Sequence, residues 1–128
     1  MSASWFEEWI TRAEEDYRAA TALGPSEVPC VTCFHSQQCV EKYLKAALVK
    51  YNVEPSRTHN LIVLGDMVSE HDERFTAFGN DLSTLNPYSV LPRYPGIETT
   101  PENAKQALAV ASRLRHRIRA LLDLEQKE

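Results

Sequence analysis

The segment from Cys33 to Tyr51 is the feature that most constrains how this chain can fold. It contains neither Gly nor Pro, and good helix formers fill its second half. Wound as a helix, it places a mainly apolar set of side chains on one face: Cys33, Gln37, Val40, Leu44, Ala47, Leu48 and Tyr51. Gln37 lies in the middle of that face and Glu41 at its margin, whereas His35, Lys42 and Ala46 are expected to point away. An unpaired buried polar group costs roughly 1–3 kcal/mol, so the rest of the chain must supply partners for Gln37 and Glu41.

Length and composition predict one ordinary soluble domain, residues 1–128. Hydrophobic residues make up 43% of the chain and charged residues 25%, which is enough to build a core. A net charge of -4 argues against a general nucleic-acid coat, which would be basic. No run approaches the roughly 20 apolar residues that cross a membrane, and the N-terminus lacks the pattern of a signal peptide. We therefore expect a cytoplasmic location and no membrane association.

The three cysteines predict neither a disulfide framework nor a metal site. Their number is odd, and Cys30 and Cys33 form a single Cys-x-x-Cys pair without a second pair. His35 follows too closely to complete the usual zinc spacing. We expect buried thiols, and neither a metal nor a cofactor.

Helical periodicity recurs along the whole chain, and no segment alternates with the period of a strand. The expected fold class is all-α, an up-and-down bundle of four long helices plus one short helix. The first helix should start at a capping box of Ser4 and Glu7 and end at Gly24-Pro25. A loop over residues 25–31 should precede the second helix, which is expected to end near Tyr51.

Three further helices are expected in the second half. Thr58 can cap one of them, another should run from about Asp72 to just before Pro87, and Thr100-Pro101 should open the last. Between the last two, residues 86–96 contain three prolines, two tyrosines and an arginine, which predicts an ordered loop.

Two charged segments have simple structural explanations. Glu14-Glu15-Asp16 is expected to be a solvated helix face. Four arginines alternate near the C-terminus, and they are either a nucleic-acid surface or helix-end cations that meet the N-terminal acids: Arg113, Arg115, Arg117 and Arg119.

Three motifs resemble those of the HEPN family, in order and spacing: the run from Phe34 to Ala46, then Arg57-Thr58-His59-Asn60-Leu61, then Arg93-Tyr94-Pro95. The resemblance implies a helical bundle that usually forms a homodimer. It also implies a partner, because such domains are often encoded beside a minimal nucleotidyltransferase in a toxin–antitoxin arrangement.

One departure from the family pattern weakens the case for an enzyme. Many HEPN ribonucleases carry an Arg followed four to six residues later by His, and none of the four histidines here has such an Arg upstream. The chain instead resembles the subgroup with an Arg-Tyr-Pro loop, for which nucleotide binding is proposed. We therefore assign no catalytic residue.

The candidate ligand-binding residues are Gln37, Glu41, Lys45, Arg57, His59, Arg93 and Tyr94. Lys45 lies one helical turn beyond Glu41 and can pair with it, which fits a ligand pocket or a purely structural network. Arg57 and His59 flank a helix start, where backbone N–H groups favour a phosphate. They could also be a solvated arginine and a histidine bonded to a nearby carbonyl. Arg93 and Tyr94 lie on the proline-stiffened loop, which could hold a phosphate and a base or could simply form a bend.

Three functions remain open from the sequence. The first is a nucleotide- or phosphate-binding module of a toxin–antitoxin pair. The second is a metal-independent ribonuclease toxin, with RNA as substrate and His59 as general acid or base. The third is a structural dimerisation module.

Overall fold

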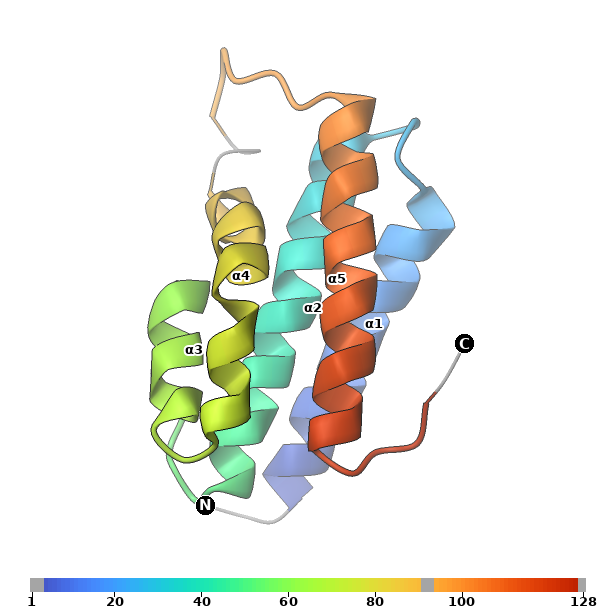
Figure 1. The fold of residues 1–128 in the computed structure, drawn as a ribbon. Coiled ribbons are helices and arrows are strands. Elements are labelled where there is room, and N and C mark those ends of the chain that lie inside the picture. The colour runs from blue at the N-terminus through green and yellow to red at the C-terminus, as the bar shows by residue number, and fades with distance from the viewer. Residues whose placement is uncertain (1–3, 91–93, 127–128) are drawn as a thin grey trace.

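The structure, a computed structural model, describes residues 4–90 and 94–126 (Figure 1). Within those residues the chain forms helices and no strand, which confirms the all-α bundle. The elements, with η for 3-10 helices, are α1 (Ser4–Leu23), α2 (Pro29–Lys50), α3 (Leu61–Ser69), η1 (Glu73–Phe78), α4 (Gly79–Leu85), η2 (Asn86–Ser89) and α5 (Pro101–Leu121). The long members are α1, α2 and α5, and the remaining side of the bundle is built from shorter pieces.

Helix α2 forms the centre of the bundle. In Figure 1 it lies behind α5, with α3 and α4 on one side of it and α1 on the other. It is therefore buried on nearly all sides, and Ala46, expected to point away, is fully buried. Its small side chain lets a neighbouring helix approach closely, which a one-sided amphipathic pattern does not reveal.

Two helices begin at residues other than those expected. Helix α2 starts at Pro29, inside the expected loop, because proline suits the first helical position. Helix α3 is capped by Asn60 and not by Thr58: Asn60 Oδ1 accepts hydrogen bonds from the N–H groups of Ile62 (2.9 Å) and Val63 (3.2 Å). The Thr58 hydroxyl oxygen instead accepts from the N–H of Asn60.

The expected fourth long helix is divided into η1, α4 and η2. Asp72 caps η1 by accepting from the N–H of Arg74, and Gly79 stands where η1 gives way to α4. Pro87 lies inside η2. At α5 the prediction is confirmed: Thr100 precedes Pro101, the first helical residue, and forms a capping box with Asn103.

The core runs along both flanks of α2. Its largest fully buried apolar side chains are Tyr43, Leu44, Leu48, Leu61, Leu64, Phe75, Phe78, Leu85, Leu114 and Ile118.

No helix in the described part of the chain is both long and apolar enough to cross a membrane. The start of α1 adjoins residues 1–3, so its capping box stays a prediction.

Candidate functional site

The Glu41 carboxylate, on α2, is the centre of a polar cluster. Its side chain is only 3% exposed, yet four neighbouring side chains reach it. Lys45 Nζ lies 3.3 Å from Oε2, one helical turn further along α2. His59 Nδ1 lies 3.2 Å from both oxygens, from the segment that precedes α3. A buried carboxylate needs such partners, and Lys45 is the one that the helical spacing predicted.

Two glutamines complete the cluster. Gln37 Nε2 donates to the backbone carbonyl of His59 at 3.1 Å and lies 3.4 Å from Glu41 Oε1. Gln38 Nε2 donates to Gln37 Oε1 at 2.7 Å and to Glu41 Oε1 at 3.3 Å. Gln37 thereby fastens the segment before α3 to α2, which positions the imidazole ring. Sequence reasoning missed Gln38, although its spacing of three residues from Glu41 was a usable signal.

His59 links this buried cluster to the surface. Its side chain is 67% exposed although Nδ1 is held by a buried carboxylate. Among the described residues Nε2 has no hydrogen-bond partner, so it is available to a ligand. Arg57 is exposed two residues earlier. The arrangement can hold a phosphate with a guanidinium and an oriented imidazole.

The start of α3 does not offer free N–H groups to an anion. Leu61 N–H donates to the side chain of Asn86 at 2.8 Å, and the next two N–H groups donate to Asn60. The expectation that this helix end would grip a phosphate through its backbone is therefore corrected. Any anion recognition here must come from side chains.

The described residues of the proline-rich loop, 86–90 and 94–96, make no hydrogen bond to this cluster. Tyr94 is 57% exposed, and no hydrogen bond connects it with the described residues of the cluster. Arg93 lies outside the described residues. Both stay predictions.

Glu14 forms a second buried network, between α1, α2 and α5. Arg115 grips both of its oxygens at 2.7 Å, and the Tyr43 hydroxyl donates to one of them at 2.5 Å. Arg119 in turn donates to the Tyr43 oxygen at 2.9 Å. Burial alone would raise the pKa of Glu14, but these hydrogen bonds outweigh burial and hold the pKa below its usual range.

This second network bears on two expectations from the sequence, the solvated face at Glu14 and the role of the C-terminal arginines. Glu14 is not on a solvated face, since its side chain is 16% exposed. Two of the four C-terminal arginines pair with an N-terminal acid, since Arg115 and Arg119 are buried against Glu14. Arg113 instead pairs with Asp81, and Arg117 lies over the Phe78 ring.

A third buried carboxylate, Asp16, pairs with two residues that were expected to point away. His35 Nδ1 lies 2.7 Å from one of its oxygens, and Lys42 Nζ lies 2.5 Å from the other. Both side chains lie towards α1 and not towards open solvent. Their partners could not be inferred from α2 alone.

Cys33 and Cys39 are buried in an environment that disfavours the reactive thiolate. Burial raises the pKa of the Cys33 thiol to about 11 and raises that of Cys39 further. No disulfide joins the three cysteines. The expectation of buried thiols holds for Cys33 and Cys39, whereas Cys30 is partly exposed.

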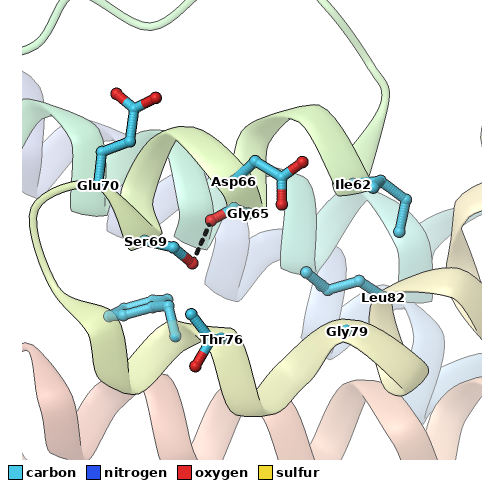
Figure 2. Close-up of a pocket in the computed structure, with 9 residues that line it drawn as sticks. Ile62, Gly65, Asp66, Ser69, Glu70, Thr76, Gly79 and Leu82 are labelled. Carbon is cyan, nitrogen blue, oxygen red and sulfur yellow. Dashed lines mark hydrogen bonds between the residues drawn. The ribbon is translucent and has the colours of Figure 1, made fainter.

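A hollow of about 320 Å³ lies away from these clusters, between α3 on one side and η1 and α4 on the other (Figure 2). Asp66 and Glu70 stand at its α3 side, and Ser69 donates a hydrogen bond to the carbonyl of Gly65. Its lining contains no Lys, Arg or His. Two carboxylates without a cation repel phosphate, so this hollow is not the predicted ligand site.

The helical bundle with a polar cluster on its central helix defines a known class of protein. A family model for the HEPN domain matches residues 6–121, and the chain therefore belongs to the HEPN family. A protein of Methanocaldococcus jannaschii named "Putative toxin MJ1304" is 31% identical over 93 residues. That match covers 68% of this chain and 61% of the relative, so the chain spans less than two thirds of the relative's length.

Two crystal structures share the fold. TT1696 from Thermus thermophilus superposes with a TM-score of 0.76 at 21% identity, over 90% of this chain and 96% of the other. ST0689, described as an archaeal HEPN homologue, gives a TM-score of 0.71 at 22% identity, over 91% and 97%. At these identities the likeness shows the shared architecture alone.

Proposed function

We propose that this chain is the HEPN half of a toxin–antitoxin pair and that it binds a nucleotide or another phosphate-bearing ligand at the Glu41–His59 cluster. Its partner would be a minimal nucleotidyltransferase, and the chain itself would form a homodimer. The toxin-related role is supported by family membership and by the name of the M. jannaschii relative.

One observation carries the binding proposal: a buried carboxylate holds a histidine whose ring is mostly in solvent. A surface histidine free to rotate loses entropy when it binds, whereas His59 is already oriented through Nδ1. In its protonated form the ring can then donate Nε2–H to a phosphate oxygen, and Arg57, exposed two residues earlier in the chain, offers a second donor. Lys45 balances the charge of Glu41, so the carboxylate does not repel an incoming anion.

The proposed binding residues divide into two groups. Gln37, Glu41 and Lys45 position the ring and the segment that carries it. Contacts to the ligand would come from Arg57, His59, Arg93 and Tyr94.

The test is a titration of purified, nucleic-acid-free protein with nucleotides and with ribose 5-phosphate, followed by thermal stability. A ligand that binds only the folded state raises the unfolding midpoint. We expect His59→Ala to remove that rise and His116→Ala, at another exposed histidine, to keep it. Equal stabilisation of the His59→Ala variant and the parent would contradict the proposal.

A second candidate is the metal-independent ribonuclease. The observation in its favour is the same pairing, because a carboxylate on Nδ1 leaves Nε2 as the nitrogen that can accept a proton from a ribose 2′-hydroxyl. Arg57 would stabilise the charge that develops on the phosphate. Cleavage of RNA by the pure protein, lost in His59→Ala, would establish it, and intact RNA after prolonged incubation would reject it.

A further inference from the structure

A second hollow, of about 300 Å³, opens on the first turns of α1. It is lined by Trp5, Glu8, Trp9 and Arg12. The chain has two tryptophans, and both line this hollow. Its volume is at the lower end of those that hold small ligands.

The aromatic wall of this hollow is open to solvent. Trp5 is 43% exposed, and Trp9 is only partly buried. Arg12 and Glu8 pair loosely at 3.8 Å with both side chains well exposed. Such a pair contributes little to stability, so both side chains can turn to the edge of a bound ring.

A chain of contacts connects this hollow with the Glu41–His59 cluster. Lys45 Nζ lies over the Trp9 ring, 5.4 Å from its centroid. The same ammonium is 3.3 Å from Glu41, whose oxygens are 3.2 Å from His59. Helix α1 thereby places an aromatic surface next to the Lys45 ammonium, which in turn contacts the carboxylate that holds His59.

We propose that Trp5 and Trp9 form a nucleobase subsite for the ligand whose phosphate binds at His59. The proposal rests on the proposed function, and it assigns a binding site to the base of the ligand, which the phosphate site does not contact. Indole rings stack on any base, and stacking is the usual way in which proteins hold unpaired bases. Glu8 and Arg12 supply an acceptor and donors for the edge of the base. The base can belong to a free nucleotide or to single-stranded RNA.

Tryptophan fluorescence reports directly on this subsite, because no tryptophan lies elsewhere in the chain. The probes are AMP, UMP, adenosine, a short single-stranded RNA and ribose 5-phosphate, with binding measured in parallel by calorimetry. We expect saturable quenching by every probe that contains a base and none by ribose 5-phosphate. Tighter binding of AMP than of the RNA would identify a free nucleotide as the ligand, and the reverse order would identify RNA.

Variants separate stacking from phosphate binding. Trp5→Ala should weaken AMP binding about tenfold, as expected for one lost base–aromatic stack. It should leave the affinity for ribose 5-phosphate unchanged. Val63→Ala is the matched control, because Val63 is also an exposed hydrophobic residue, 43% exposed, but lies on α3.

Each outcome bears on one of the two proposals or on both. Equal affinity for AMP and ribose 5-phosphate, without quenching, would overturn the base subsite and leave the phosphate site standing. Quenching by adenosine and AMP alike, unaffected by His59→Ala, would support the subsite and overturn the phosphate site. No binding of any probe would overturn both. Emission that changes with protein concentration but not with added base would assign the tryptophans to contact between copies of the chain and overturn the subsite.

Discussion

Glu14, which is partly buried, and Glu41, which is buried, are two carboxylates that the same bundle stabilises in different ways. Glu14 is held by a guanidinium and a phenol from other helices, both of them buried. Glu41 is held by amides, by a lysine on its own helix and by a histidine whose ring reaches solvent.

The difference indicates which cluster serves the fold and which serves a ligand. The Glu14 network joins three helices through an arginine that stays charged at every accessible pH, and the Glu14 and Arg115 side chains are only 16% and 6% exposed. The Glu41 cluster ends in His59, whose side chain is 67% exposed and can contact a ligand. Truncation should therefore cost stability at Glu14 and binding at Glu41.

The largest expected effect is that of Arg115→Ala. It leaves the Glu14 carboxylate buried without its main partner, which should lower the free energy of unfolding by about 3–5 kcal/mol. Urea denaturation measures the loss. Arg113→Ala is the control, because Arg113 forms a half-exposed pair with Asp81 and should cost at most about 1 kcal/mol. Equal losses of stability in the two variants would contradict the claim that the Glu14 network serves the fold.

Asp72→Asn tests an intermediate case, a buried carboxylate with an exposed partner. Hydrogen bonds from Arg74 lower the pKa of Asp72 from 3.8 to about 2. Because the folded pKa lies below the unfolded one, ionised Asp72 stabilises the protein above about pH 4, and this stabilisation disappears as the pH falls towards 2.

The Asp72→Asn variant should therefore lose about 1–2 kcal/mol at neutral pH, reduced from the full pKa effect because Arg74 is 61% exposed. Urea unfolding at several pH values should show the two proteins converging near pH 2. A difference that persists there would mean that lost packing, and not ionisation, explains the cost.

Tyr43→Phe removes a single hydroxyl from the Glu14 network. Burial, together with the hydrogen bond to Glu14, raises the pKa of Tyr43, so the hydroxyl remains a donor throughout the working pH range. Its loss should cost about 1 kcal/mol in thermal or urea unfolding. Tyr17→Phe, which breaks a bond to Ser112 outside the network, is the comparison variant. A larger loss of stability in Tyr17→Phe than in Tyr43→Phe would contradict the claim that the Glu14 network serves the fold.

His59→Ala should have the smallest effect on stability, below about 1 kcal/mol. Glu41 keeps Lys45 and both glutamines as partners in this variant. Chemical denaturation of the ligand-free protein provides the measurement. A loss above about 2 kcal/mol would make the Glu41 cluster structural, like that of Glu14.

Local rules explain what could be predicted of the site. Gln37, Glu41 and Lys45 were expected on one part of α2 because residues four apart on a helix lie one turn apart, whatever surrounds them. The cap of α5 followed from Thr100 and Pro101 in the same way. The cap of α3 was misassigned because Thr58 and Asn60 are both good capping residues, and the sequence does not say which one starts the helix.

The sequence alone determined the helical class of this protein, the position of its central helix and the polar side chains on that helix, because periodicity and hydrogen bonding within a helix are local. Only the tertiary structure decided that Glu14 is buried and that His59 is oriented by Glu41. Arg115 reaches Glu14 across 101 positions, and Lys45 lies over Trp9 of a different helix. Such partners are selected by how helices pack, and no spacing in the chain records that choice.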